Sequence, residues 1–421
     1  MRTKRINVMF ILWGFSVPFP GAAWRRIDFF SRYLLRKGFN VFIVGSRSIG
    51  KSFLLHRIKT VKSIVKNAKA KENLSSYDLP ILNIPFRISI GARPLNILLA
   101  LIPLLTLFLI LRPHVVLVSI PSNESVLATY IFGKILRFKV IVDIRDPVEE
   151  LYYTYYAKGS VKKMIAKIIK KINYAIYKHV DAVIVVTSKL KSMLSSEGIK
   201  TILIPNGADL NTFKPYLDHR RHVRKILGIN EEDVVIVVSG SETSYYPVHK
   251  FLPYLALIKK ECNNANFKLK LLLVGKFANT FKCSKILGIQ NSIIYAGSYQ
   301  NPIKVAEILS AADLGLIYRV SDPVFDYSVP AKFYEYIACG LPVFVIARRE
   351  SELARITKSW KVGIMCDYNV KCIVSFLKDL TIYGTKILES YRKRVLKSRF
   401  KVNRARAACK LALLLKKLLE A

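Results

Sequence analysis

The chain has 421 residues, of which 52% are hydrophobic, and this excludes a mainly disordered protein and is sufficient for two or three domains. The 68 lysines and arginines against 28 aspartates and glutamates give a net charge of +40, which predicts attraction to polyanions: nucleic acid, anionic lipid or phosphorylated substrates. The charge carries no information about the fold, which must come from the pattern of the elements.

Between residues 6 and 187, short runs rich in Val and Ile alternate with helical patterns. The runs predict strands at 6–12, 40–45, 114–120, 139–144 and 182–187. They are continuously apolar, which indicates strands covered on both faces, as in a parallel sheet. The basic start and the apolar run after it resemble a signal peptide, but the run is short and leads directly to Arg25 and Arg26, so we expect a first strand. A helix should follow it and end at Gly38.

Residues 45–52 match a known phosphate-binding pattern. Gly45, Gly50, Lys51 and Ser52 satisfy G-x-x-x-x-G-K-[ST], in which glycine N–H groups and a lysine hold phosphates. The pattern fixes only four positions, and such loops normally follow the first strand of their domain, whereas here the strand at 6–12 precedes it. We therefore expect a basic loop and helix that continue through residues 58–71. A P-loop NTPase that uses residues 45–52 is the alternative.

Residues 94–113 form the most apolar stretch of the chain. The uninterrupted apolar part, residues 97–111, is shorter than the roughly 20 residues needed to span the hydrocarbon core, and Pro103 lies inside it. A strand follows at once, so a true span would divide the first sheet. The pattern favours a helix in the membrane interface, with a buried helix and a membrane-spanning helix as alternatives.

A second helix, at residues 161–180, combines an apolar stripe with a lysine stripe. The apolar stripe comprises Val161, Met164, Ile165, Ile168, Ile169, Ile172 and Ile176, and the lysine stripe comprises Lys162, Lys163, Lys167, Lys170 and Lys171. Such a helix is more often a core helix with a solvated outer face, but beside residues 97–111 it also fits binding to an anionic membrane surface. No RNA-binding motif or recognition helix favours nucleic acid as the partner.

A second alternating series begins near residue 205. Runs at 234–240, 270–275, 293–298, 314–318 and 341–347 predict its strands. We therefore expect an α/β fold with two doubly wound Rossmann-like domains, residues 1–208 and 209–395, followed by a helix at 396–421 that can pack back on the first domain. Ligands bind such sheets at the carboxyl ends of the strands, so a cleft between the domains is expected.

The cysteines show no pairing signal. The chain has no C-x-x-C pair and no His at metal-ligand spacing from a Cys. We therefore expect free thiols in a reducing compartment. The six positions are Cys262, Cys283, Cys339, Cys366, Cys372 and Cys409.

Four segments, in order, resemble GT-B fold glycosyltransferases of family 4. They are "FPGAAWRRIDFFSRYLLRKGFNVFIV" near the N-terminus, "VIVDIRDPVEE", "IPNGADLNTFKP" at 204–215 and "PAKFYEYIACGLPVFV" at 330–345. The resemblance covers nearly the whole chain. It implies two Rossmann-like domains facing each other across a cleft, an acceptor on the first domain, a nucleotide-sugar donor on the second, and transfer with retention of anomeric configuration.

The resemblance also implies a donor site. Glu335 matches the family glutamate that accepts hydrogen bonds from the donor ribose, and Lys332 lies one turn before it. Glycines that end successive apolar runs let backbone N–H groups approach a pyrophosphate, although each can equally be a turn glycine. The candidates for donor binding are Gly21, Gly240, Lys250, Gly275, Gly297, Lys332 and Glu335.

The chain departs from the family pattern within this site. The acid that often precedes the glutamate is replaced by Tyr327, with Asp326 beside it. The arginine and lysine that commonly clamp the diphosphate are not evident in "SGSETSYYPVHK", where His249 or Lys250 can substitute.

The acceptor side is also incomplete. Relatives often carry a His after the fourth strand of the first domain, where this chain reads "SIPSNES". The group that assists acceptor deprotonation is therefore open among Asp146, Glu149 and Glu150, and Asp146 can equally cap the following segment. The candidate catalytic residues are Glu335, Lys332 and Asp146.

These observations favour a glycosyltransferase that adds a sugar to a lipid-linked or other membrane-presented acceptor. A basic cleft and backbone amides can stabilise the departing diphosphate, and no D-x-D pair lies near the strand ends, so we expect neither an essential metal nor a cofactor. We expect a cytoplasmic protein bound peripherally to the inner face of the cell membrane. The alternatives are the P-loop NTPase and a non-catalytic GT-B relative that binds a glycan or nucleotide.

Overall fold

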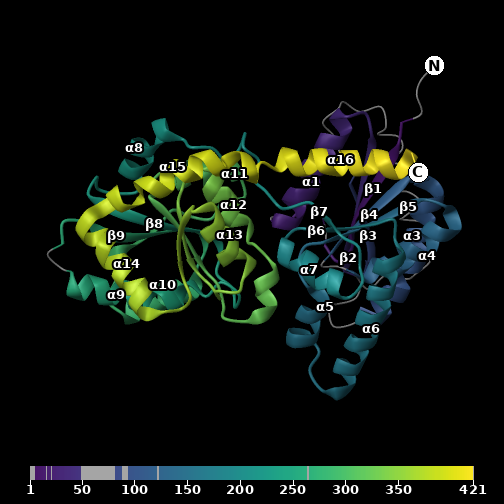
Figure 1. Ribbon diagram of the computed structural model, residues 1–421, viewed down its shortest axis with the longest axis horizontal. Coiled ribbons are helices and arrows are strands. Elements are labelled where there is room, and N and C mark those ends of the chain that lie inside the picture. Colours follow the sequence, from purple (N-terminus) through teal and green to yellow (C-terminus); the bar gives the residue numbers. More distant parts are fainter. Residues whose placement is uncertain are drawn as a thin grey trace. The chain divides into compact units, whose positions relative to one another are not determined.

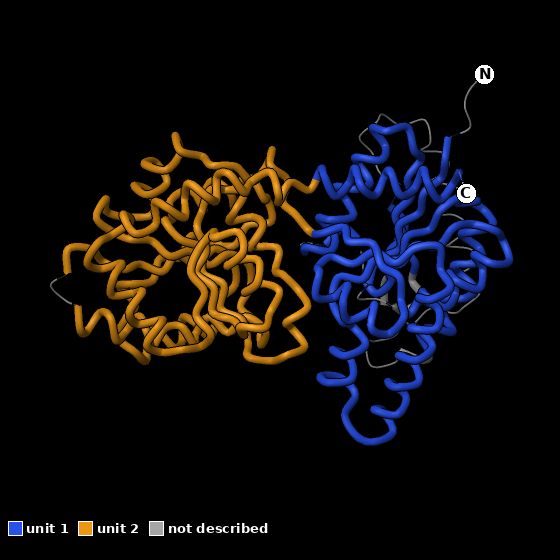
Figure 2. The backbone as a smooth tube through the Cα atoms, viewed as in Figure 1, with its two compact units in different colours: residues 1–205, 405–421 blue, residues 206–404 orange. Residues whose placement is uncertain are grey.

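The computed structural model describes residues 5–15, 17–19, 21–48, 81–87, 93–120, 123–262 and 265–420. The chain forms two compact units, which Figure 2 shows in blue and orange. Unit 1 comprises Met1–Pro205 with Ala405–Ala421, and unit 2 comprises Asn206–Arg404. The C-terminal residues therefore return to the unit in which the chain begins.

Unit 1 is built on a seven-stranded parallel sheet in the order β3-β2-β1-β4-β5-β6-β7. The strands are β1 (Asn7–Leu12), β2 (Asn40–Ser48), β3 (Ile81–Arg87), β4 (Val115–Ile120), β5 (Lys139–Ile144), β6 (Ala182–Val185) and β7 (Ile202–Leu203). The helices are α1 (Ala22–Arg36), α3 (Arg93–Leu111), α4 (Val126–Leu136), α5 (Val148–Leu151), α6 (Ser160–His179), α7 (Ser188–Ser196) and α16 (Arg404–Glu420), with the short turns η3 (Asn123–Ser125) and η4 (Tyr152–Tyr156).

The last helix completes the core of unit 1. Figure 1 shows α16 in yellow beside α1, and Ala408, Leu411 and Leu415 of α16 join a buried cluster with Phe10 and Phe30. The helix begins at Arg404, so residues 396–403, which we had grouped with it, belong to unit 2.

The physical reason for this boundary is a pairing of the two ends of unit 2. The Ala208 N–H donates to the Val402 carbonyl (2.8 Å), and the Arg404 N–H donates to the Ala208 carbonyl (3.0 Å). Unit 2 therefore begins at residue 206, where we had predicted 209, and ends at residue 404, where we had predicted 395.

Unit 2 is built on a six-stranded parallel sheet in the order β10-β9-β8-β11-β12-β13. The strands are β8 (Asp233–Ser241), β9 (Lys268–Lys276), β10 (Ile293–Tyr295), β11 (Leu314–Tyr318), β12 (Val343–Ile346) and β13 (Gly363–Cys366). The helices are α8 (Leu217–Ile226), α9 (Leu252–Glu261), α10 (Ala278–Ile286), α11 (Pro302–Leu309), α12 (Ala331–Ala338), α13 (Glu352–Trp360), α14 (Val370–Tyr383) and α15 (Glu389–Ser398). Single helical turns connect them: η5 (Val248–Phe251), η6 (Gln290–Ser292), η7 (Pro323–Tyr327), η8 (Gly384–Leu388) and η9 (Arg399–Val402).

Both sheets are covered on both faces, which confirms the predicted pair of doubly wound α/β units. In unit 2, alternate residues of β8 enter two separate cores: Val235 and Val237 face one, and Val234 and Ile236 face the other. The strand order reverses direction between β8 and β11, and ligands of such sheets bind at the carboxyl ends of the strands beside this point.

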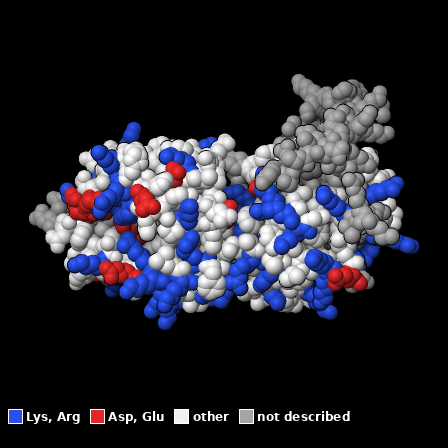
Figure 3. Space-filling view, turned by 90° about the horizontal axis from the view of Figure 1, so that it is seen from above, with Lys and Arg blue, Asp and Glu red and all other residues white. Residues whose placement is uncertain are grey.

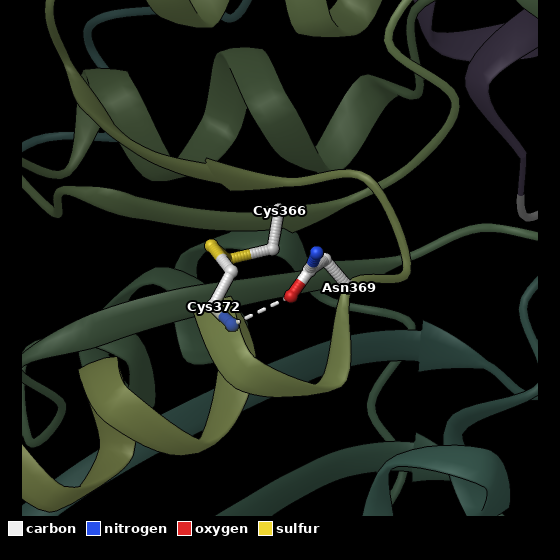
Figure 4. Close-up of a disulfide and its surroundings, with 3 residues drawn as sticks. All are labelled: Cys366, Asn369 and Cys372. Atoms are coloured by element: carbon white, nitrogen blue, oxygen red, sulfur yellow. Dashed lines mark hydrogen bonds between the residues drawn. A yellow bond between two sulfur atoms is a disulfide. The ribbon is translucent and has the colours of Figure 1, made fainter.

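The expectation of free thiols is wrong for two cysteines. Cys366 ends β13, Cys372 lies in the first turn of α14, and the two form a disulfide (Figure 4). Asn369 caps α14 by accepting a hydrogen bond from the Cys372 N–H (3.0 Å), and this tight turn brings the two Cα atoms to 5.9 Å. Cys262, Cys283, Cys339 and Cys409 are free.

No helix in the described part of the chain has the length and apolar character needed to cross a membrane. The stretch predicted at 97–111 forms the major part of α3, with Pro103 inside the helix.

Candidate functional site

Three glycines meet at the carboxyl edge of the unit 2 sheet. Gly240 of β8 is in register with Gly275 of β9, and the Gly275 N–H donates to the Gly297 carbonyl (2.8 Å). A Cβ on Gly275 would lie 1.7 Å from the Gly240 carbonyl oxygen, so the close strand approach itself requires glycine there. Gly240 has φ +100°, and its Cβ would lie 3.9 Å from Nζ of Lys332. The carboxyl end of β8 therefore lies close to a lysine of α12.

Helix α12 is held against this edge by Tyr336. The buried Tyr336 hydroxyl accepts a hydrogen bond from the Ser239 N–H (2.8 Å), at the end of β8. Gly315 of β11 leaves room for the Tyr336 ring, since a Cβ there would approach the ring to 2.3 Å. Pro330, extended at φ −65°, precedes the helix and sets its start. The Tyr336 contacts thus pack α12 against β8 and β11, and Lys332, in the first turn of α12, lies beside Gly240 of β8.

Lys332 and Glu335 lie one turn apart on α12. Glu335 is 4% exposed, and Lys332 is partly exposed, with its Nζ 4.7 Å from the centroid of the Tyr246 ring. The pKa of Lys332 is lowered to about 8: desolvation of the ammonium is the largest cause, Glu335 opposes the shift, and the charge of Arg319 adds to it. The ammonium is consequently less stable than in water, and an anion beside it would favour its protonated form.

Arg319 is a member of the site that our sequence reasoning missed. It follows β11 directly and is 5% exposed. Its guanidinium donates to the Tyr246 hydroxyl (3.0 Å) and to Oγ of Ser328 (2.8 Å), and lies 4.9 Å from the Phe325 ring centroid. The available signal was its position, since a charged residue directly after a predicted central strand falls at the ligand-binding edge.

Arg319 and Lys332 bring two positive charges to this edge of the sheet, and Glu335, one turn along α12, is the acid whose charge acts on Lys332. Within the described residues neither side chain forms an ion pair, and the Nε of Arg319 is buried without a hydrogen-bond partner. Both cations contact Tyr246, one through its hydroxyl and both over its ring. Two partly desolvated cations beside a glycine turn and a helix N-terminus form an arrangement suited to a phosphate-bearing ligand.

Two further predicted phosphate ligands, Lys250 and His249, lie on η5, in the segment that follows β8. Lys250 is exposed on η5. His249 is bound to Glu242, with 2.6 Å between Nδ1 and Oε1, and Glu242 also accepts from the Thr280 N–H. Burial opposes ionisation of Glu242, but these hydrogen bonds outweigh it and lower its pKa. Glu242 therefore orders this loop and holds the His249 ring.

The acid beside the substituted family position also has a structural partner. Asp326 is 4% exposed and forms an ion pair with Arg348, with 3.3 Å between the carboxylate and Nε. Tyr327, at the family position itself, is partly exposed at the end of η7.

The remaining candidates lie in unit 1. Gly21 precedes α1 in an extended conformation (φ −173°). Asp146 is partly exposed; its carbonyl accepts from the Val148 N–H, but no side-chain cap is present at the start of α5. Glu149 is buried and accepts hydrogen bonds from Asn173 and Tyr177, and Glu150 pairs with Lys170. Glu149 and Glu150 thus hold α6 in place. Of the three candidate acids, Asp146 is the one for which no such contact with α6 is found in the described part of the chain.

Of the P-loop pattern at residues 45–52, the structure describes only residues 45–48, and these form part of a strand. Residues 45–48 belong to β2, and a Cβ on Gly45 would approach the Phe15 carbonyl and Asn83 Oδ1 to 2.6 Å. This glycine therefore serves close packing inside a sheet. Gly50, Lys51 and Ser52 lie outside the described residues. No group of three or more His, Cys, Asp or Glu side chains that could hold a metal is found among the residues described.

Comparison with known proteins finds no matching family model and no matching curated protein. Solved structures match over nearly the whole chain. Sucrose-phosphate synthase from Thermosynechococcus elongatus is 15% identical, with a TM-score of 0.71 over 99% of this chain and 100% of that one. Anabaena HepE, solved in complex with UDP, is 13% identical, with a TM-score of 0.63 over 98% and 100%. WaaG, a glycosyltransferase involved in lipopolysaccharide biosynthesis, is 14% identical, with a TM-score of 0.63 over 96% and 98%.

These matches confirm the predicted resemblance at the level of the fold: the chain has the GT-B glycosyltransferase fold. At such low sequence identity the likeness establishes architecture, and the chemistry must be argued from the residues of the site.

Proposed function

We propose that this chain is a glycosyltransferase that uses a nucleotide-sugar donor, bound at the carboxyl edge of the unit 2 sheet. The observation that carries the proposal is the pair Arg319 and Lys332, two cations without an ion-pair partner in the described structure, beside Gly240 and the start of α12. The UDP complex of HepE is in keeping with a nucleoside diphosphate as the ligand class.

In the proposed reaction, the bond between the anomeric carbon and the donor diphosphate breaks, and the electron pair leaves with the diphosphate. Lys332 and Arg319 stabilise the charge that develops on the leaving group, and this does not require a metal. Glu335 accepts hydrogen bonds from the donor ribose, as the family resemblance implies. The acceptor hydroxyl bonds to the anomeric carbon and loses its proton, with retention of configuration; Asp146 is the candidate base.

A panel of nucleoside diphosphates tests the donor class. UDP, GDP and ADP are titrated into the purified protein and thermal stability is followed, because a ligand bound only by the folded state raises the melting temperature. One base should stabilise the native protein and lose most of that effect in Glu335→Gln. Glu389→Gln, an exposed glutamate on α15, is the matched control. Binding without sugar transfer to any acceptor would favour the non-catalytic alternative.

We further propose that the acceptor is presented by an anionic membrane and that unit 1 binds its surface, at the cytoplasmic face. Support comes from a row of exposed apolar side chains on α3, which includes Leu98 (61% exposed), Ile102 and Leu109. Phe108, on the same helix, is buried and packs on Phe138. With Leu95, these exposed residues are three, four and seven positions apart, which places them along one face of the helix, as on an interfacial helix.

Helix α6 carries a second exposed apolar row beside lysines. Val161, Met164, Ile168 and Ile172 are exposed, while Ile169 and Ile176 are buried, so the predicted stripe divides between core and surface. Both α3 and α6 pack against α4, which adds Ile131 and Ile135 to the exposed set. Figure 3, which looks at the face that carries α16 and α15 rather than α6, shows Lys and Arg spread widely there, with acidic side chains in small groups. Apolar insertion and lysine attraction act together on anionic lipid.

Vesicle sedimentation tests this part of the proposal. Binding should require anionic lipid, weaken with salt, and fall further when Leu98, Ile102 and Ile168 are changed to Ser. The matched control is Ile286→Ser, an exposed isoleucine on α10 of unit 2. Equal binding to neutral and anionic vesicles, or to neither, would contradict a membrane role for this charge.

A further inference from the structure

The disulfide of unit 2 closes a turn that contacts the proposed donor site. The turn runs from Cys366, at the end of β13, to Cys372 in α14 (Figure 4). Between them Tyr368 adopts a left-handed conformation at φ +49°, which residues other than glycine rarely take. Such a conformation persists where the surroundings impose it. Here Tyr368 lies inside the loop that the disulfide closes, directly before Asn369, which caps α14.

Tyr368 reaches from this turn to the backbone of Arg319. Its hydroxyl donates to the Arg319 carbonyl (2.8 Å), and its ring lies edge-on to Tyr318, with 6.1 Å between centroids. Burial raises the pKa of Tyr368, so the hydroxyl stays protonated and able to donate at neutral pH. The Arg319 N–H donates to the Ile346 carbonyl (2.9 Å). Arg319 is therefore held on one side by the neighbouring strand and on the other by Tyr368.

The same turn also contacts the loop after β12. Asp367 accepts a hydrogen bond from the Arg349 N–H (3.2 Å) and pairs with the Arg349 guanidinium (3.7 Å). Arg348, the preceding residue, holds Asp326. A change in the conformation of the turn would consequently alter the contacts of Arg319 and those of the loop after β12, which pairs with Asp326 through Arg348.

We propose that the Cys366–Cys372 disulfide is a redox-responsive positioning device that keeps Tyr368 on Arg319 and so sets the affinity of the site for a donor diphosphate. This proposal rests on the function proposed above. Cys366 is buried and Cys372 is partly exposed, so a dithiol reductant attacks Sγ of Cys372 and Cys366 leaves as a thiolate that then takes up a proton. Two electrons and two protons pass to the protein, and the reductant becomes a disulfide.

The test measures, by calorimetry, the affinity of the full chain for UDP or for the diphosphate that the panel selects. We compare the oxidised protein, the protein reduced with dithiothreitol, and the protein reoxidised. Loss of one hydrogen bond that positions a phosphate ligand should weaken the diphosphate about three- to tenfold on reduction, with recovery on reoxidation. Tyr368→Phe keeps the ring and should show the weaker affinity in both redox states. Cys409→Ser removes an exposed free thiol of α16 and should behave as the native protein.

The outcomes separate this inference from the proposed function. If no diphosphate binds in any state, the proposed function fails and this inference with it. If the diphosphate binds equally in both redox states, or Tyr368→Phe binds as tightly as the oxidised native protein, the inference alone is overturned. A lower melting temperature after reduction, with unchanged affinity, would assign the disulfide a role in stability only.

Discussion

Binding of a diphosphate at the proposed site should weaken as the pH rises through 8, because Lys332 loses its proton in that range. The pKa of Lys332 is about 8 in the free protein, because desolvation and the charge of Arg319 lower it and Glu335 only partly opposes the shift. A bound diphosphate adds negative charge beside the ammonium and raises its pKa. Binding is therefore coupled to protonation: the affinity is at its maximum below the free-protein pKa and falls above it.

The size of the effect follows from the free-protein pKa. A group with a pKa of about 8 is about nine-tenths protonated at pH 7 and about one-thirtieth protonated at pH 9.5. If only the protonated form binds well, affinity should fall about 30-fold between these pH values, which is about 2 kcal/mol. Exposed lysines, with a pKa of about 10.4, would change little over the same interval.

The assay is calorimetric titration with UDP from pH 6.5 to 9.5 at constant ionic strength, because salt screens the charge interactions. Lys332→Met should bind weakly and show no steep loss above pH 8. Lys285→Met, an exposed lysine on α10, is the matched control and should keep the native profile. Ionisation of UDP itself is common to the three proteins and cancels. A flat native profile, or an unchanged profile in Lys332→Met, would refute the reasoning.

Three further predictions concern the site and its support. Arg319→Ala should weaken diphosphate binding by about 1.5–3 kcal/mol without loss of secondary structure, measured by calorimetry and circular dichroism, because the variant loses a charged hydrogen-bond donor. Asp313→Asn should lower the free energy of unfolding by about 3 kcal/mol in urea, since the buried Asp313 carboxylate pairs with Arg220, Arg224 and Arg392; an unchanged midpoint would contradict it. Lys51→Ala should leave diphosphate affinity and transfer unchanged, and a folded but inactive variant would revive the P-loop interpretation.

The central strands could be predicted because burial on both faces leaves a continuous apolar run in the sequence. β1 and β8 are interior strands of their sheets, and their residues 8–12 and 234–238 are continuously apolar. The edge strands lack this signal. β3 contains Pro85, which is compatible with an edge strand but interrupts the pattern, and β13 has only four residues.

The site could be predicted only where its residues share one local element. Lys332 and Glu335 are neighbours on α12, so their spacing is visible in the sequence. Arg319 gains its role from Tyr246, 73 residues earlier, and a contact of that separation leaves no local pattern. The disulfide was missed for a similar reason, since a six-residue separation has no general meaning until a turn and a capped helix start bring the cysteines together.

The most direct test of the central claim is an experimental structure of the chain with UDP, or with the diphosphate that binds best. The account predicts the diphosphate within hydrogen-bond distance of Arg319 and Lys332 at the ends of β8 and β11, and the ribose hydroxyls on Glu335. A nucleotide bound at another place, or a diphosphate in contact with neither cation, would contradict it.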